Sequence, residues 1–380
     1  MDPTKVFCHN PNCIASGKLG LKNIGIHSII QSRYICHICG KTFTDTKGTI
    51  FYRLKHSEQY VTLIITLLAF GCPTIAVVKA FGLDERTVAD WQCRAGIHCQ
   101  KVHRHLVQEP HDLGQIQADE IRVKHQGGIA WLAMAIAVST RLWLGGVVSA
   151  CRDANLIMSL IEQVRCCALY LRCCALYRPL LFCVDGFVAY VSAIQKVFRI
   201  PIINGKRGRP SLKAYENLCI VRVIKQVSGK RVMGITQRIA CGTWKQACLL
   251  IKHTQNTLNA HTAYIERING TFRSRITALV RRGRSLVCQL ATLRNVMYLV
   301  GTVYNFCTPH KSLRKVLYLT DKSFDNHRWI PMTPAMAAGI TDHVWTVSEL
   351  LSYQLPLPYW KQPIGRPSKR MKELINRWNL

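Results

Sequence analysis

The sequence predicts a multidomain fold: a small metal-binding domain, then an α-helical domain, then a larger α/β domain. Three observations predict it. Two close pairs of cysteines lie near the N-terminus, apolar residues recur at helical spacing over residues 57–106, and strand-like and helix-like runs alternate over residues 112–320. A chain of 380 residues is long enough for two or three such domains.

The chain is strongly basic, with 51 Lys and Arg residues against 20 Asp and Glu residues and a formal net charge of +31. This excess favours a polyanionic partner, first nucleic acid and second an anionic membrane. The membrane is the poorer alternative, because no apolar run is long enough to span it and no basic amphipathic helix with an aromatic edge is visible. The N-terminus has no apolar stretch beside a small-residue cleavage site, so we expect a cytoplasmic protein.

Cysteines near the N-terminus indicate a zinc site. Cys8 and Cys13 form one close pair, Cys36 and Cys39 form the other, and a glycine follows the second pair. We expect a zinc-ribbon domain over residues 1–50, with these four cysteines as Zn²⁺ ligands. The alternative is unligated buried thiols, but so short and polar a segment has little core without a metal. Three histidines could each replace a cysteine as ligand: His9, His27 and His37.

Residues 57–106 are expected to form a helix-turn-helix domain. Apolar side chains line a first short helix: Ile75, Val77 and Val78. Gly82 makes the turn, and Asp84 can cap a second helix that carries Val88 and Trp91 inward.

The exposed side of that second helix would face DNA, with its first turn toward the base edges. The expected DNA contacts are Arg86, Thr87 and Arg94. The alternative is a plain hairpin of two helices, but the neighbouring zinc segment and the basic charge favour DNA binding.

Acidic residues are scarce, so a carboxylate inside an apolar run is informative. Asp119 lies in a predicted strand, and alternation places it on the face of Ile121 and Val123, with Glu120 on the other face. We therefore expect Asp119 to be the inward-facing carboxylate. Two further strands should follow over residues 128–150 as an antiparallel meander, and then a helix from about residue 154 to 176.

Two more carboxylates follow. Asp185 ends a continuously apolar strand, and the carboxyl ends of strands are where open α/β sheets collect their sites. Glu266 lies on a predicted helix, in one stripe with Asn269 and Arg273. Carboxylates from a strand, a strand end and a helix could converge on two Mg²⁺ (or Mn²⁺) ions for phosphoryl transfer. The alternative is three unrelated acids, each paired with an arginine.

These motifs resemble the DDE transposases of bacterial insertion sequences. The likeness is to the group that joins an InsA-like zinc and helix-turn-helix part to an InsB-like catalytic part. It rests on Asp119 in ADE, Asp185 in VDGFVAY and Glu266 in YIERINGTFRSRITALVRRGRS, and on the two cysteine pairs. The resemblance implies an RNase H-like α/β domain over residues 112–320, with these three acids as catalytic Mg²⁺ ligands.

It also implies the reaction and the partners. The expected chemistry is cleavage of the donor strand at terminal inverted repeats, followed by strand transfer into target DNA. Both ends must be brought together, which implies at least a homodimer on double-stranded DNA in the nucleoid. Four residues of the Glu266 segment are expected to contact DNA: Arg267, Asn269, Arg273 and Arg275.

One departure from the family concerns spacing. Asp185 and Glu266 are separated by 80 residues, whereas the InsB-like proteins have only a few tens. We therefore expect an insertion over about residues 200–260 that contains a β-hairpin turning at residues 228–230.

Basic segments and a repeat complete the pattern. Arg207 and Arg209 lie in an Arg-Gly-Arg-Pro string typical of a minor-groove AT-hook, and half of such a motif lies in the basic C-terminal tail over residues 321–380. The alternative is a solvated basic loop. A tandem RCCALY repeat over residues 165–177 is a weak sign of a decayed copy. The alternative function is therefore a zinc and helix-turn-helix DNA-binding regulator without catalysis.

Overall fold

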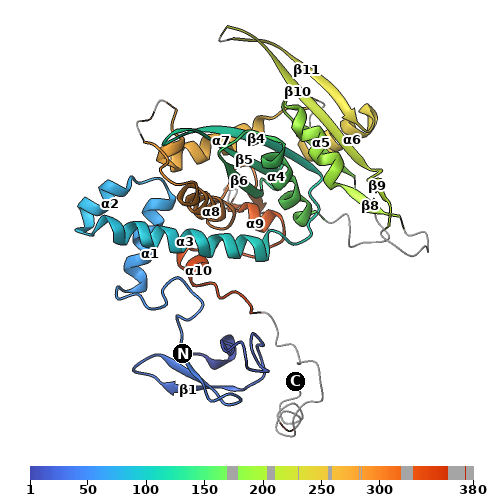
Figure 1. Cartoon of the computed structure of the whole chain (residues 1–380). Coiled ribbons are helices and arrows are strands. Elements are labelled where there is room, and N and C mark those ends of the chain that lie inside the picture. Colours follow the sequence, from blue (N-terminus) through green and yellow to red (C-terminus); the bar gives the residue numbers. More distant parts are fainter. Residues whose placement is uncertain are drawn as a thin grey trace, which may run out of the picture. The chain divides into compact units, whose positions relative to one another are not determined.

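The computed structural model describes residues 1–168, 179–202, 210–229, 231–255, 259–281, 283, 285–317, 328–357 and 373. The chain divides into two compact units (Figure 1), Met1–Thr62 with Leu351–Leu380, and Leu63–Leu350. The predicted AT-hook arginines, Arg207 and Arg209, lie outside the described residues, as do most of the RCCALY repeat and most of the basic tail.

The first unit contains a small antiparallel sheet made of β1 (Ile24–Ser28), β2 (Arg33–Cys36) and β3 (Thr42–Thr44), preceded by the short helix η1 (Pro3–Lys5). Its apolar cluster is small and includes three of the four predicted zinc ligands beside Tyr34 and Phe43. A core of this size gives little stability alone, which is the usual reason for a structural metal.

The second unit is built on a six-stranded mixed sheet in the order β11-β10-β7-β4-β5-β6. The strands β4 (Gln115–His125), β5 (Gly128–Ala137) and β6 (Trp143–Ser149) form the predicted antiparallel meander. Next to β4 lie β7 (Leu180–Val184), parallel to it, and β10 (Leu218–Ser228), parallel to β7. The sheet therefore changes from antiparallel to parallel pairing at β4.

The predicted hairpin is confirmed: β10 pairs antiparallel with β11 (Arg231–Cys241). It is not an appendage to the domain, however, because β10 extends the central sheet. Alternate side chains of β10 are buried with Leu181 and Cys183 of β7: Cys219, Val221 and Val223. The 80 residues between Asp185 and Glu266 thus include a strand of the central sheet, whereas the sequence predicted only an insertion there.

Helices cover both faces of this sheet (Figure 1). The helices α4 (Ala154–Cys167) and α5 (Val188–Val197) pack on the face that includes Ile116, Phe182 and Val184. The other face of β7 and β10 packs against α6 (Trp244–Gln255). The helices α7 (Ala263–Arg275) and α8 (Leu290–Cys307) follow. The helix predicted to reach about residue 176 ends at Cys167, so its predicted end is wrong: the next residue, Ala168, has an extended backbone with a φ of -93° and a ψ of 132°.

The helices predicted over residues 57–106 are α1 (Glu58–Ala69), α2 (Thr74–Phe81) and α3 (Glu85–Leu106). Gly82 adopts a φ of 62° and ends α2, while Asp84 caps α3 by accepting from the backbone N–H of Arg86 at 2.8 Å. Val88 and Trp91 are buried as predicted, but Ile75 is 61% exposed, so its expected inward position is wrong.

The long helix α3 also belongs to the core of the second unit. It packs along α8, and a Cβ added at Gly96 would lie 2.4 Å from the backbone oxygen of Asn295. From Leu63 onward, the predicted helical domain and the predicted α/β domain therefore form one unit.

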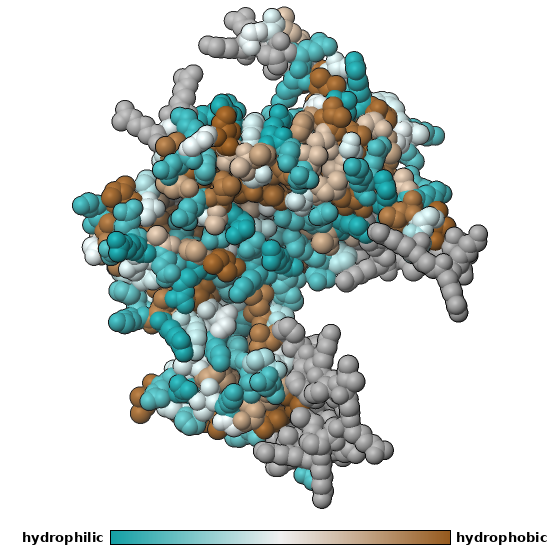
Figure 2. Space-filling model, viewed as in Figure 1, coloured by the Kyte–Doolittle hydropathy of each residue, from teal (hydrophilic) through white to brown (hydrophobic). Residues whose placement is uncertain are grey.

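The remaining elements are short: β8 (Arg199–Pro201), β9 (Leu212–Ala214), η3 (Thr277–Leu279), β12 (Lys315–Leu317), β13 (Arg328–Ile330), α9 (Pro334–Ala337) and α10 (Val347–Ser352). Figure 2 shows hydrophilic side chains over much of the face in view, interrupted by hydrophobic patches. Among the described residues, no helix has both the length and the apolar composition needed to cross a membrane.

Candidate functional site

Asp119 and Asp185 lie next to each other where the sheet changes direction. In the parallel pairing of β4 with β7, Ala118 is opposite Val184, so the two aspartates are the next residues on neighbouring strands. Carboxylate oxygens of Asp119, Glu120 and Asp185 all lie within 4.8 Å of one another. A crevice at the carboxyl end of a strand beside such a switch point is a common place for a ligand site in α/β sheets.

Local hydrogen bonds orient both aspartates. Asp119 Oδ1 accepts from the backbone N–H of Glu120 at 2.8 Å, and its Oδ2 accepts from Asn269 Nδ2 at 2.9 Å. Asp185 Oδ1 accepts from the backbone N–H of Phe187 at 2.9 Å, which closes a tight turn after β7. The carboxylates are therefore held in defined rotamers before any ligand binds.

The third predicted carboxylate reaches the site because a buried glutamine docks α7 on β4. Gln117 Nε2 donates to the backbone oxygen of His261 at 2.6 Å, and its Oε1 accepts from the backbone N–H groups of Tyr264 and Ile265 at 3.0 and 3.1 Å. These N–H groups belong to the first turn of the helix, where no backbone acceptor is available. The position of Glu266 thus follows from a side chain two residues before Asp119.

Asp119, Asp185 and Glu266 line one cavity of about 310 Å³ together with Lys225 and Thr262. A neighbouring cavity shares Asp119, Lys225 and Glu266 and adds three further side chains: Asn269, Arg273 and Arg281. The three acids chosen from the sequence are therefore brought together, although Glu266 does not belong to the group of oxygens within 4.8 Å. In this structure Glu266 forms an ion pair with Lys225 and accepts from Thr262 Oγ1 at 2.9 Å.

Glu120 is a member of the site that the sequence reasoning missed. Alternation placed it on the face opposite to Asp119, with Arg122 and Lys124, and made Asp119 the better inward-facing carboxylate, but Glu120 is itself buried, with 9% of its surface exposed. The expectation fails at Glu120 because the protein covers this position on both faces of β4, although Arg122 and Lys124 further along are exposed. On the side of Glu120, Arg152 Nη2 lies 3.0 Å from Glu120 Oε2. The adjacent acidic pair in ADE was the one available signal.

Electrostatics indicate a site that suits a cation. Burial raises the pKa of Asp119 to about 6, with further contributions from Glu120, Asp185 and Glu266. Burial and then the charge of Asp185 raise the pKa of Glu120. Burial would also raise the pKa of Glu266, but hydrogen bonds from Lys225 and Thr262 outweigh it and leave that pKa lowered. Carboxylates crowded in this way are stabilised as anions by a nearby positive charge.

The donor set fits a hard divalent cation. Carboxylate oxygens are the ligands that Mg²⁺ and Mn²⁺ prefer. The oxygens of Asp119, Glu120 and Asp185, within 4.8 Å of one another, are such a donor set. Glu120 is also engaged within the protein, because Arg152 Nη2 lies 3.0 Å from its Oε2 and a hydrogen bond with the buried Tyr190 hydroxyl counteracts the rise in its pKa caused by burial.

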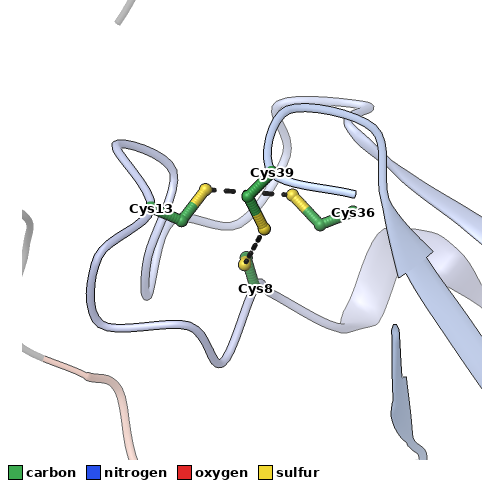
Figure 3. Close-up of side chains that lie close together, drawn as sticks. All are labelled: Cys8, Cys13, Cys36 and Cys39. Atoms are coloured by element: carbon green, nitrogen blue, oxygen red, sulfur yellow. Dashed lines mark hydrogen bonds between the residues drawn. The ribbon is translucent and has the colours of Figure 1, made fainter. Parts of the chain in front are cut away.

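The four N-terminal cysteines form a second candidate metal site (Figure 3). Their sulfurs lie close together, with Cys8 Sγ 3.7 Å from Cys39 Sγ and Cys13 Sγ 3.9 Å from Cys36 Sγ. All four thiols are free. A tetrahedron with Zn–S bonds of about 2.3 Å has edges of about 3.8 Å, whereas a disulfide requires about 2.05 Å. The spacing therefore fits four thiolate ligands around one zinc ion.

Backbone and side-chain contacts preorganise this cysteine cluster. Gly40 has a φ of 69°, and its N–H donates to the backbone oxygen of Cys36 at 2.8 Å in the turn after the second pair. Asn23 Nδ2 lies 3.3 Å from Cys36 Sγ, as an outer partner that orients the ligand. Of the histidines that could have replaced a cysteine, His9 instead packs against Phe7 and Phe43, with ring centroids 4.7 and 5.1 Å away.

The described residues among the predicted DNA contacts differ in exposure. Arg86 and Arg267 are exposed, and Thr87 and Arg94 are half-buried. Arg273 lines the cavity that Asp119 shares with Asn269, and it also lines a separate cavity beside Glu120.

Two of the predicted DNA contacts are engaged within the protein. Asn269 is buried and donates to Asp119. Arg275 lies over the Phe70 ring, 4.5 Å from its centroid, and donates to Thr308 Oγ1 at 3.4 Å. Asn269 and Arg275 therefore have structural contacts within the protein, in addition to any contact with DNA.

In comparisons with known proteins, no family model and no curated protein matches this chain. The functional assignment consequently rests on the geometry of the two sites and on the sequence motifs.

Proposed function

We propose that this protein is a transposase of a DNA insertion sequence, with an RNase H-like catalytic domain and a DDE site. One observation carries the proposal: Asp119, Asp185 and Glu266, which are far apart in the sequence, line a single cavity at the switch point of a mixed sheet. The reaction would be donor-strand cleavage at terminal inverted repeats and transfer of the freed strand into target DNA.

Each residue of the site would have a distinct role. Asp119, Asp185 and Glu266 would hold two Mg²⁺ ions, which, when bound, activate a water or a 3′-hydroxyl and stabilise the leaving oxygen. Asn269 orients Asp119. Lys225 and Arg273 line the cavity walls and would bind the phosphates that flank the scissile bond. No serine or tyrosine nucleophile is needed, because the attacking group comes from water or from DNA.

The remaining parts would bind DNA. We propose that the four-cysteine cluster holds Zn²⁺ and that the exposed start of α3, including Arg86, contacts the ends of the element. The net charge of +31 supports a DNA partner that is bound largely through its phosphates. Two element ends must meet in one complex, so a homodimer or larger assembly on nucleoid DNA follows from the proposed reaction.

A supercoiled plasmid that carries the gene with its native flanks tests the proposal. Purified protein and Mg²⁺ are added, and new 3′ ends are mapped for the wild type and for Asp185→Asn. The wild type should cut at paired inverted repeats, and Asp185→Asn should bind these repeats without cutting. The matched control is Asp153→Asn, because Asp153 caps α4 and asparagine caps equally well. Equal cutting by Asp185→Asn and the wild type would refute the site.

A DNA-binding regulator is the second candidate. The observation that favours it is the ion pair of Glu266 with Lys225, which occupies the carboxylate that catalysis requires. Footprints at the repeats without any cut, in the wild type as in Asp185→Asn, would support this alternative.

A further inference from the structure

Arg152 is a fixed positive charge within the carboxylate group of the second unit. Its Nη2 lies 3.0 Å from Glu120 Oε2 and 3.7 Å from Asp185 Oδ2. Aromatic rings hold the guanidinium in place, because its Cζ lies 5.1 Å from the Trp131 ring centroid and 4.4 Å from that of Phe187. The residue that follows Arg152 caps α4, so the backbone of Arg152 is anchored as well.

The chemistry of arginine suits this place. A planar guanidinium can bond two carboxylates at once while it stacks on aromatic faces, which a lysine ammonium cannot do equally well. Glu120 is the reason that the cation is needed. Its side chain is 1% exposed, and a buried carboxylate without a charged partner is strongly destabilising. Arg152, in contrast, is 36% exposed and keeps contact with solvent.

Together, these contacts restrain both oxygens of Asp185. Oδ1 accepts from the backbone N–H of Phe187, and Oδ2 faces Arg152. We propose that Glu120 and Arg152 are positioning residues: Glu120 holds Arg152, and Arg152 holds Asp185 beside Asp119 so that a divalent cation can bind. This inference rests on the proposed function, and it assigns a role to two residues, Glu120 and Arg152, that are not among the three DDE carboxylates.

Direct metal binding to the full chain tests this role, without reference to DNA cleavage. Tb³⁺ luminescence and Mn²⁺ titration by electron paramagnetic resonance are measured for the wild type, Arg152→Ala and Arg152→Lys. Loss of an outer-shell partner typically weakens metal binding about 10–100-fold, which is the loss expected for Arg152→Ala. Arg152→Lys keeps the charge but not the planar fork, so it should lie between the two. Wild-type affinity in both variants would overturn the proposal.

A matched control separates positioning from general electrostatics. Arg122 lies two residues after Glu120 on the same face of β4 and is exposed. Arg122→Ala removes the same charge and should leave metal affinity within about twofold of the wild type, since Arg122 forms no ion pair with a carboxylate in the part of the chain that the structure describes. A loss as large as that of Arg152→Ala would show that charge alone explains the effect and would overturn the proposal.

A double-mutant cycle tests whether Glu120 acts through Arg152. Glu120→Gln should weaken metal binding in the wild-type background but add no further loss in the Arg152→Ala background, where the charge that Glu120 holds is absent. An equal loss in every background would show that Glu120 binds the metal directly and would overturn the positioning role. Thermal unfolding of each variant shows that the chain is folded.

The results also separate this inference from the proposed function. If the wild type binds neither Tb³⁺ nor Mn²⁺ at the carboxylates, the metal site itself fails and both proposals fall. If the wild type binds metal and cuts DNA while the Arg152 variants bind metal equally well, only the positioning role is wrong.

Discussion

Asn269 donates a hydrogen bond of 2.9 Å to Asp119 across 150 positions of sequence. The bond joins the middle of α7 to β4 and leaves Asp119 with both oxygens engaged, one by Asn269 and one by the backbone N–H of Glu120. The amide Oδ1 of Asn269 is buried and lacks a partner among the described residues. The hydrogen bond from Nδ2 to Asp119 is therefore the contact that orients this side chain. The helix that carries Glu266 therefore also orients the first aspartate.

Replacement of Asn269 by alanine should weaken metal binding and cleavage about 10–100-fold, because Asp119 loses the partner that sets its rotamer. Asn269→Asp should be worse, since it places a like charge beside Asp119. Mn²⁺ titration and 3′-end mapping measure the two effects. The control on the same helix is Gly270→Ala, whose added Cβ meets nothing within 4 Å. Full activity of Asn269→Ala would show that the bond is dispensable.

Cys36→Ser should abolish zinc binding, because one of the four thiolates is lost from the cluster. The wild type should carry one zinc ion per chain by native mass spectrometry and should lose it to a chelator. Because a structural metal contributes folding free energy, chelation should expose the amides of β1–β3 to hydrogen exchange while β4–β7 stay protected. Cys151→Ser, an exposed cysteine outside the cluster, is the control. Retention of a full zinc equivalent by Cys36→Ser would contradict the assignment.

Gln117→Leu should destabilise the second unit, because leucine is similar in size but leaves three buried or partly buried backbone groups at and just before the start of α7 without this partner. Each unsatisfied group costs about 1–3 kcal/mol. Urea denaturation measures the loss in the free energy of unfolding. Cleavage should fall by a larger factor than the folded fraction. The reason is that Gln117 bonds the residues directly before Glu266, so its loss should also displace that carboxylate from the site. Proportional losses of fold and activity would mean that Gln117 serves stability alone.

His103 should make stability depend on pH in the acid range. It is fully buried beside Trp143, its Nε2 donates to the backbone oxygen of Leu144 at 3.2 Å, and burial lowers its pKa to about 4. The unfolded histidine, with a pKa of about 6.5, binds a proton that the folded one excludes. The free energy of unfolding should therefore decrease as the pH falls from about 6.5 to 4, with a contribution near pH 5 of about 1.2 kcal/mol per pH unit.

The variant His103→Gln checks that contribution, because glutamine can still donate to Leu144 but does not titrate. The free energy of unfolding, measured by urea denaturation at several pH values, should change less steeply with pH than in the wild type, by the equivalent of about one bound proton. Unchanged slopes would show that the acid sensitivity comes from other groups, such as His98, which burial also shifts to a pKa of about 4.

Much of the local structure could be predicted because short-range patterns determine it. Strand-like runs predicted β4–β6, a turn at residues 228–230 marked the hairpin, and Gly82 and Asp84 predicted the turn and cap between α2 and α3. The cysteine spacing predicted a cluster that indeed forms. The three acids were chosen for their scarcity and strand context, and they line one cavity.

Other features depended on long-range packing. Glu120 is buried because Arg152, 32 positions later, supplies its counter-charge. The side chain of Gln117 docks α7 by accepting from Tyr264, 147 positions away, and α3 is a core helix because α8 packs along it.

The sequence by itself determined which residues are apolar, which can turn or cap, and which can bind a metal, because these properties depend on a side chain and its near neighbours. Only the tertiary structure decided which acids share a cavity, which arginine is a counter-ion and which strand extends the sheet. The reason is physical: burial and charge pairing arise between segments that only the folded chain brings together, so no local pattern contains them.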